Sequence, residues 1–160
     1  MKAKARLFGH PIHQMLIVFP LGVLGMSLFF DIAYLITERT ELGTTAFWMI
    51  FGGVIGGLLA AIFGLIDWLA IPAGTRAKRI GLWHGCGNVV VVGLFIGSWF
   101  LRRPDPGLPK IAAIVVSAVA VGIALITGWL GGELVDRMGV GVDEGANLNA
   151  PSTLSGRPVA

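Results

Sequence analysis

The 160-residue chain is 55% hydrophobic and only 13% charged, and its mean hydropathy of +0.82 lies outside the range of water-soluble domains. The net charge is +3, but the basic residues stand at the ends of apolar segments, which is typical of membrane topology and not of a nucleic-acid interface. The sequence has no glycine-rich phosphate loop, no gathered Ser/His/Asp set and no paired carboxylates. The composition therefore argues against a soluble enzyme and against a nucleic-acid-binding protein.

Four apolar segments are each long enough, as a helix, to cross a hydrocarbon core about 30 Å thick. They cover about residues 14–36, 46–71, 82–101 and 111–130. In lipid every backbone polar group needs a partner within its own element, and the alternating pattern of a barrel strand does not occur in the sequence. We therefore predict an all-α, polytopic membrane four-helix bundle over residues 1–142. No internal repeat is evident beyond the alternation of spans.

The first apolar segment opens with a histidine-proline motif, Gly9-His10-Pro11-Ile12-His13. Pro11 suits the first position of a helix, which would place His10 at the N-cap and His13 in the opening turn, with the two imidazoles facing each other. The apolar run that follows is longer than that of a secretory signal, and no small-residue cleavage site comes after it. We therefore expect this segment to be the first transmembrane helix.

Rows of small residues mark the second and fourth apolar segments. In the second segment they recur along one side: Gly52, Gly53, Gly56, Gly57, Ala60, Ala61 and Gly64. The fourth segment repeats the pattern more weakly between Ala113 and Gly128. Because small side chains let backbones approach closely, we expect these two helices to pack tightly together, although the same rows would equally serve a homodimer.

Asp31 is the only ionisable residue expected in the outer half of the membrane core, where it would face Tyr34 or an internal water. The hydroxyl groups of the predicted spans are too scattered to form an ion path with it: Ser27, Ser98, Ser117 and Thr127. We therefore rank transport low among the functions considered.

The third apolar segment carries His84 and Asn88 on one helical face, so that the amide of Asn88 could orient the imidazole. Bare backbone next to this histidine would leave space for a flat macrocycle: Gly81, Gly85 and Gly87. The loop before the segment holds three basic residues that could pair with the propionates of a haem: Arg76, Lys78 and Arg79. The single cysteine, Cys86, leaves no thiolate cluster available within one chain.

Basic residues divide unevenly between the two ends of the predicted bundle. Eight stand on the side of the N-terminus: Lys2, Lys4, Arg6, Arg76, Lys78, Arg79, Arg137 and Arg157. Four stand on the other side: Arg39, Arg102, Arg103 and Lys110. By the positive-inside rule we expect both termini in the cytoplasm and the chain in an inner membrane. Residues 143–160 are rich in Asn, Ser, Gly and Pro, and are expected to be disordered alone or to lie extended on a partner.

Ionisable groups inside a membrane are costly, and here they gather at the predicted cytoplasmic end: His10, His13, Asp67, His84 and Glu133. Two histidines from different helices meet the axial requirement of a b-type haem, whereas three histidines with a carboxylate suit zinc, iron or copper. A third interpretation stays open, in which the histidines are interfacial anchors and Asp67 pairs with the basic loop.

These motifs resemble a bacterial membrane family catalogued as domain of unknown function 2231. The resemblance covers nearly the whole chain, from Gly9-His10-Pro11-Ile12-His13 through Gly64-Leu65-Ile66-Asp67-Trp68 and His84 with Asn88 to Gly131-Gly132-Glu133-Leu134-Val135. Gln14 departs from the family, whose members usually carry a second proline there. The resemblance implies a four-helix membrane protein, and because some members are fused to Rieske-type domains, it implies proximity to electron transfer.

The sequence thus predicts an electron-transfer protein of the lipid bilayer that binds a b-type haem or another metal. His13 and His84 are the expected ligands and His10 an alternative one, while Asn88 and Asp67 would orient them and Arg76 and Arg79 would meet propionates. The corresponding set for a metal without haem is His10, His13, His84 and Asp67. The alternative is an accessory structural subunit without a cofactor, packed on a larger respiratory or photosynthetic complex.

Overall fold

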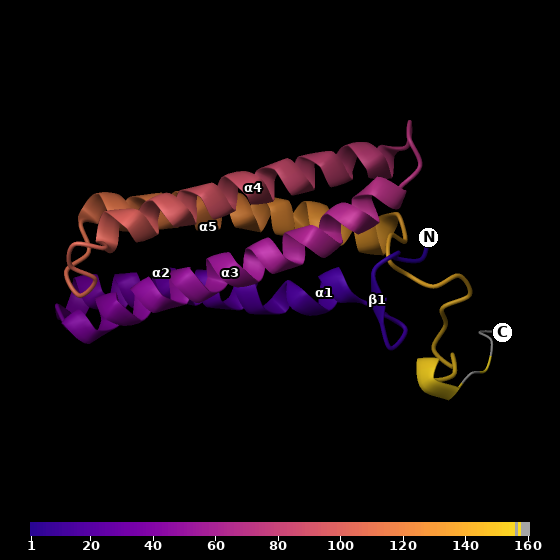
Figure 1. The fold of residues 1–160 in the computed structure, drawn as a ribbon, viewed down its shortest axis with the longest axis horizontal. Helices are drawn as coiled ribbons and strands as arrows, with labels where there is room; N and C mark the ends of the chain where they lie inside the picture. The colour runs from indigo at the N-terminus through magenta and orange to yellow at the C-terminus, as the bar shows by residue number, and fades with distance from the viewer. Residues whose placement is uncertain (156, 158–160) are drawn as a thin grey trace.

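The computed structural model describes residues 1–155 and 157, and four long helices run side by side along its length (Figure 1). The first is formed by α1 (Ile12–Leu16) and α2 (Val18–Thr37), and the others are α3 (Thr40–Ala70), α4 (Arg76–Arg102) and α5 (Ile111–Gly132). All four are long and apolar enough to cross a membrane. The predicted all-α bundle of four membrane-spanning helices is therefore confirmed.

Short elements cover the end of the bundle at which both the N-terminus and the described tail lie (Figure 1). The strands β1 (Arg6–Leu7) and β2 (His10–Pro11) form an antiparallel hairpin, and the turn residue Gly9 has a φ of 85°. Toward the C-terminus, α5 continues into a single π-helical turn, η1 (Glu133–Arg137). A 3₁₀ turn, η2 (Thr153–Ser155), stands in the tail.

Two helices begin earlier than the apolar segments do. α3 starts at Thr40 and not near 46, because Thr44 and Thr45 donate their hydroxyls to carbonyls one turn back and remain helical outside the apolar run. α4 starts at Arg76 and not near 82, because the hydroxyl of Thr75 caps it by accepting the N–H of Lys78 at 3.1 Å. The basic residues expected in a loop therefore occupy the first turn of α4.

The four helices associate as two antiparallel pairs. α2 packs mainly on α3, and we call α1–α3 the first helix pair; α4 packs mainly on α5, and we call these the second helix pair. The expected tight packing of α3 on α5 is wrong, since within the described residues these helices make at most marginal contact. The small residues of α3 instead admit side chains of α2: Gly53 lies against Leu24 and Gly56 against Pro20.

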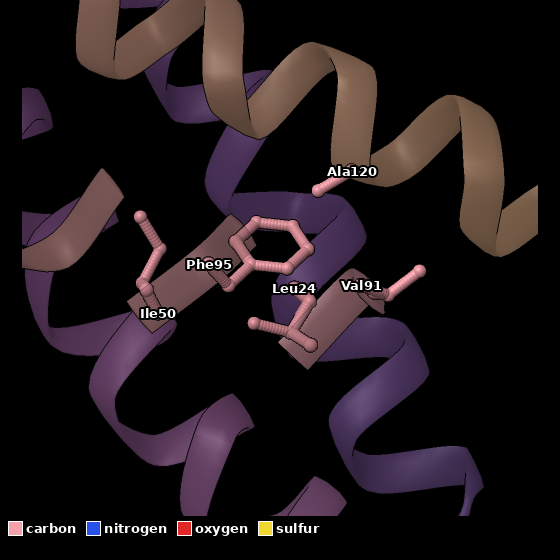
Figure 2. Close-up of a cluster of buried hydrophobic side chains, with 5 residues drawn as sticks. All are labelled: Leu24, Ile50, Val91, Phe95 and Ala120. Atoms are coloured by element: carbon pink, nitrogen blue, oxygen red, sulfur yellow. The ribbon is translucent and has the colours of Figure 1, made fainter. Parts of the chain in front are cut away.

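The apolar core lies between the two helix pairs and draws on all four long helices. Its buried members are Leu24, Ile50, Val91, Phe95 and Ala120 (Figure 2). Most other large apolar side chains of the spans are exposed on the outside of the bundle. Such an exterior suits lipid, where association depends on close packing and on polar contacts between helices and not on the exclusion of water.

Candidate functional site

His13 lies in α1 with its imidazole against the backbone of α3. Its Nδ1 is 2.8 Å from the carbonyl oxygen of Ala60. Because a carbonyl only accepts hydrogen bonds, Nδ1 carries the proton in the neutral ring and Nε2 keeps its lone pair. Gly64 lies one turn further along α3, and a Cβ there would stand 2.8 Å from the ring. The ring position therefore depends on the bare backbone of that glycine.

His84 repeats this arrangement in α4. Its Nδ1 is 2.8 Å from the carbonyl oxygen of Thr127 in α5, and a Cβ on Gly131 would stand 3.0 Å from the ring. The amide of Asn88 lies 2.9 Å from the carbonyl oxygen of His84 and 3.3 Å from its Nε2, and the hydroxyl of Thr127 donates to Asn88 Oδ1 at 3.0 Å. Asn88 thus contacts the imidazole at Nε2, and its orienting role stays a prediction.

The two imidazoles meet between the helix pairs. Their ring centroids are 6.3 Å apart and their planes are nearly perpendicular, at 86°. In the part of the chain that the structure describes, no group of three or more His, Cys, Asp or Glu side chains is placed to hold a metal. The donor set assembled here is two imidazoles.

His10 lies outside this arrangement. The expected N-cap position is wrong: α1 begins at Ile12 with Pro11 before it, and His10 belongs to strand β2, where it is exposed and opposite Leu7. The β-hairpin determines this position, because pairing with β1 keeps the backbone of His10 extended. His10 and His13 are therefore in different elements.

The other expected site residues have partners of their own at the same end. The carboxylate of Asp67 accepts the backbone N–H groups of Lys4 and Ala5, at 2.7 and 3.0 Å, and so holds the N-terminal segment on α3. Arg76 forms an ion pair with Glu133 at 3.0 Å, whereas Arg79 is exposed in the first turn of α4. Neither arginine lies in the contacts of the two imidazoles.

The other half of the bundle contains a buried ion pair that we do not predict from the sequence. Arg102 was expected in a loop and Asp31 was expected to face Tyr34 or water, but the guanidinium makes two hydrogen bonds to the carboxylate, at 2.5 and 2.7 Å. Arg102 is 1% exposed and Asp31 is fully buried. Both expectations are wrong because α4 extends to Arg102 and turns its side chain inward. The signal in the sequence was an acidic residue within an apolar segment, Asp31, because a charge in lipid requires a countercharge.

Hydroxyl groups complete the environment of this ion pair. Arg102 donates from Nε to Ser98 and from a terminal nitrogen to Ser117, both at 3.2 Å, and Ser98 donates to the carbonyl oxygen of Ala113 at 2.8 Å. A buried charge pair is tolerated only when its remaining donors and acceptors are satisfied. Two of the scattered serines, Ser98 and Ser117, thus lie around one guanidinium.

The N-terminal segment and the segment after η1 are joined above the histidine end. Backbone bonds link Met1 with Gly139 and Gly141, each at 2.9 Å, and Arg6 pairs with Asp143 at 2.7 Å. The hydrogen bond from Arg6 lowers the pKa of Asp143, and the same bond raises the pKa of Arg6. The first residue of the predicted tail is therefore attached to the bundle.

Four membrane-spanning helices with polar groups buried between them define a small polytopic integral membrane protein. The family model described as "Predicted membrane protein (DUF2231)" matches residues 9–144, and the chain belongs to this family. Neither a curated protein nor a solved structure matches the chain.

Proposed function

We propose that this integral membrane protein binds a redox cofactor, a b-type haem or a single transition metal, between His13 and His84 and acts in electron transfer in the bacterial inner membrane. One observation carries the proposal. Two imidazoles from different helix pairs face each other, and each has its Nδ1 on a backbone carbonyl of the adjacent helix. Histidines that ligate metals typically donate their second ring N–H to such an acceptor, which fixes the tautomer and leaves the lone pair of Nε2 for the metal. In His84 this nitrogen also lies 3.3 Å from the amide of Asn88, which a metal would have to displace.

The number of donors favours a haem over a closed metal site. Haem iron takes four nitrogens from the macrocycle and needs only two axial ligands from the protein, whereas a structural zinc site requires four protein ligands and a catalytic one three. Gly64 and Gly131 leave room for the imidazoles themselves, because a Cβ at these positions would stand 2.8 and 3.0 Å from the rings. The helix pairs contact each other less extensively than the helices within each pair do, and a haem held by both histidines would lie at this interface.

The proposal is tested by the haem and metal content of detergent-purified protein. The wild-type chain and a His10→Ala control are expected to carry about one equivalent of cofactor, because His10 is exposed in β2. His13→Ala and His84→Ala are expected to lose it. Equal content in all four proteins would contradict the assignment of the ligands. A cofactor-free wild-type chain that co-purifies with a larger respiratory or photosynthetic complex would favour the accessory subunit.

A further inference from the structure

The two helix pairs are equivalent to each other position by position. His13 and His84 each stand near the start of a pair and bond to a carbonyl of the next long helix. The separation between Asp31 and Arg102 is 71 residues, and the same offset relates His13 to His84. It also relates Ser27 to Ser98, both fully buried.

Burial follows this equivalence along whole helices. Adding 71 to the number of each buried residue of α2 gives a buried residue of α4. The pairs are Pro20 with Val91, Leu24 with Phe95, Ser27 with Ser98, and Asp31 with Arg102. A second constant offset, the one that separates Gly64 from Gly131, relates buried residues of α3 to all the buried residues of α5. The pairs are Ala46 with Ala113, Phe47 with Ile114, Ile50 with Ser117, Gly53 with Ala120, and Ala60 with Thr127. Only Gly43 of α3 has an exposed counterpart, Lys110.

The geometry points to a pseudo-twofold repeat whose axis runs along the bundle, and we infer that the Asp31–Arg102 ion pair selects the pairing of unlike halves. Membrane proteins are known to contain parallel repeats related in this way. Here the equivalent position carries a carboxylate in one half and a guanidinium in the other, and the two meet fully buried. The face of each half is therefore complementary to the other half and not to itself.

The consequence concerns a second copy of this chain. Association of two first helix pairs through this face would bring Asp31 against Asp31, and association of two second pairs would bring Arg102 against Arg102. Two like charges inside the membrane would have no countercharge, which is costly. The ion pair thus favours assembly of the halves of one chain and disfavours like-with-like association between molecules.

The hydroxyl groups around the ion pair differ between the two helix pairs, and this difference makes the equivalence testable. Arg102 is served by Ser98 and Ser117. The equivalent positions in the first helix pair are Ser27, which has the hydroxyl, and Ile50, which lacks it. An arginine at position 31 would therefore find one of the two hydroxyls that Arg102 uses.

Charge reversal in the full-length chain tests the inference. Asp31→Arg alone and Arg102→Asp alone would place like charges at both positions. Each is expected to lower the midpoint of thermal unfolding, followed by circular dichroism in detergent, by about 10 °C or more, and to lose the monodisperse peak on size-exclusion chromatography. The double variant Asp31→Arg/Arg102→Asp is expected to recover the monodisperse species and part of the midpoint. Adding Ile50→Ser and Ser117→Ile is expected to recover more, because it moves the second hydroxyl to the reversed arginine.

A matched control reverses the exposed ion pair Arg39–Glu41, which is expected to leave both readouts unchanged. A double reversal no better folded than the single variants would overturn the selective role of the ion pair. A quadruple variant no more stable than the double one would overturn the equivalence of Ile50 and Ser117. These readouts follow helix content and assembly, so they remain valid whether or not a cofactor is bound at the histidines.

Discussion

At the scale of single residues, the two histidines have matching backbone bonds and different side-chain surroundings. Asn88 donates toward Nε2 of His84, and Thr127 fixes Asn88. The equivalent positions around His13 hold Ile17 and Ala60, so among the described residues Nε2 of His13 has no hydrogen-bond partner. If a metal binds here, His13 would offer a free Nε2, whereas Asn88 would have to move away from Nε2 of His84 first.

Gly64→Ala tests the site without removing a ligand. Its Cβ would stand 2.8 Å from the ring of His13, so the imidazole must shift. We expect cofactor affinity to fall about tenfold or more, the range seen when the supports of a metal ligand are lost. Gly52→Ala is the control on the same helix, because no heavy atom lies within 4 Å of its Cβ position. Unchanged cofactor binding in Gly64→Ala would contradict the close approach of His13 to α3.

At the scale of elements, helix existence was predictable and helix ends were not. The four apolar runs gave the spans because length and hydropathy determine what crosses a bilayer. The ends depend on local hydrogen bonds that hydropathy does not register, such as the Thr75 cap, which moved the start of α4 back to Arg76. The β-hairpin, whose strands have only two residues each, could not be predicted for the same reason, and neither could the position of His10.

The attachment of the tail gives a prediction about pH. The pKa of Asp143 is lowered from its ordinary value of 3.8 by the Arg6 bond, so the ion pair contributes above that value and is lost as pH falls through the lowered pKa. Hydrogen exchange at residues 139–143 is therefore expected to stay slow from neutral pH down to about 3.8, after allowance for the intrinsic pH dependence of exchange, and to speed up below it. Asp143→Asn is expected to exchange faster at neutral pH.

Glu144→Gln serves as the control for this experiment, because Glu144 is the exposed acidic neighbour of Asp143. Exchange that accelerates already between pH 7 and 5 would contradict the assignment to Asp143, because its carboxylate stays ionised over that range.

At the scale of the whole molecule, the buried ion pair sharpens the charge difference between the two ends of the bundle. Arg102 belongs to the interior and is neutralised there, which leaves Arg39, Arg103 and Lys110 at one end against the eight basic residues at the other. By the positive-inside rule we therefore predict that the histidine end faces the cytoplasm. This orientation stays a prediction.

Cysteine labelling in spheroplasts checks the orientation. In a Cys86→Ala background, Ala73→Cys in the α3–α4 loop is expected to resist a membrane-impermeant thiol reagent, whereas Asp105→Cys in the α4–α5 loop is expected to react. Both should react after the membrane is opened with detergent. The reverse labelling pattern in intact spheroplasts would place the histidine end outside the cytoplasm.

The pseudo-twofold repeat marks the limit of what could be predicted from one sequence. His13, His84 and Asn88 were identified because polar groups in apolar runs are visible in the sequence. The repeat was not, because few equivalent positions carry the same residue, as Ser27 and Ser98 do, and most share only burial: Leu24 corresponds to Phe95, and Asp31 corresponds to Arg102. Burial depends on the contacts between helices, which the sequence alone does not specify.

The reduced-minus-oxidised absorption spectrum of detergent-purified protein tests the central claim most directly. We predict a sharp α-band in the wild-type chain that is lost in both His13→Ala and His84→Ala, because each imidazole would supply one ligand to a haem iron. A featureless wild-type spectrum from protein that also lacks stoichiometric metal would contradict the account and leave the two histidines as structural contacts between helices.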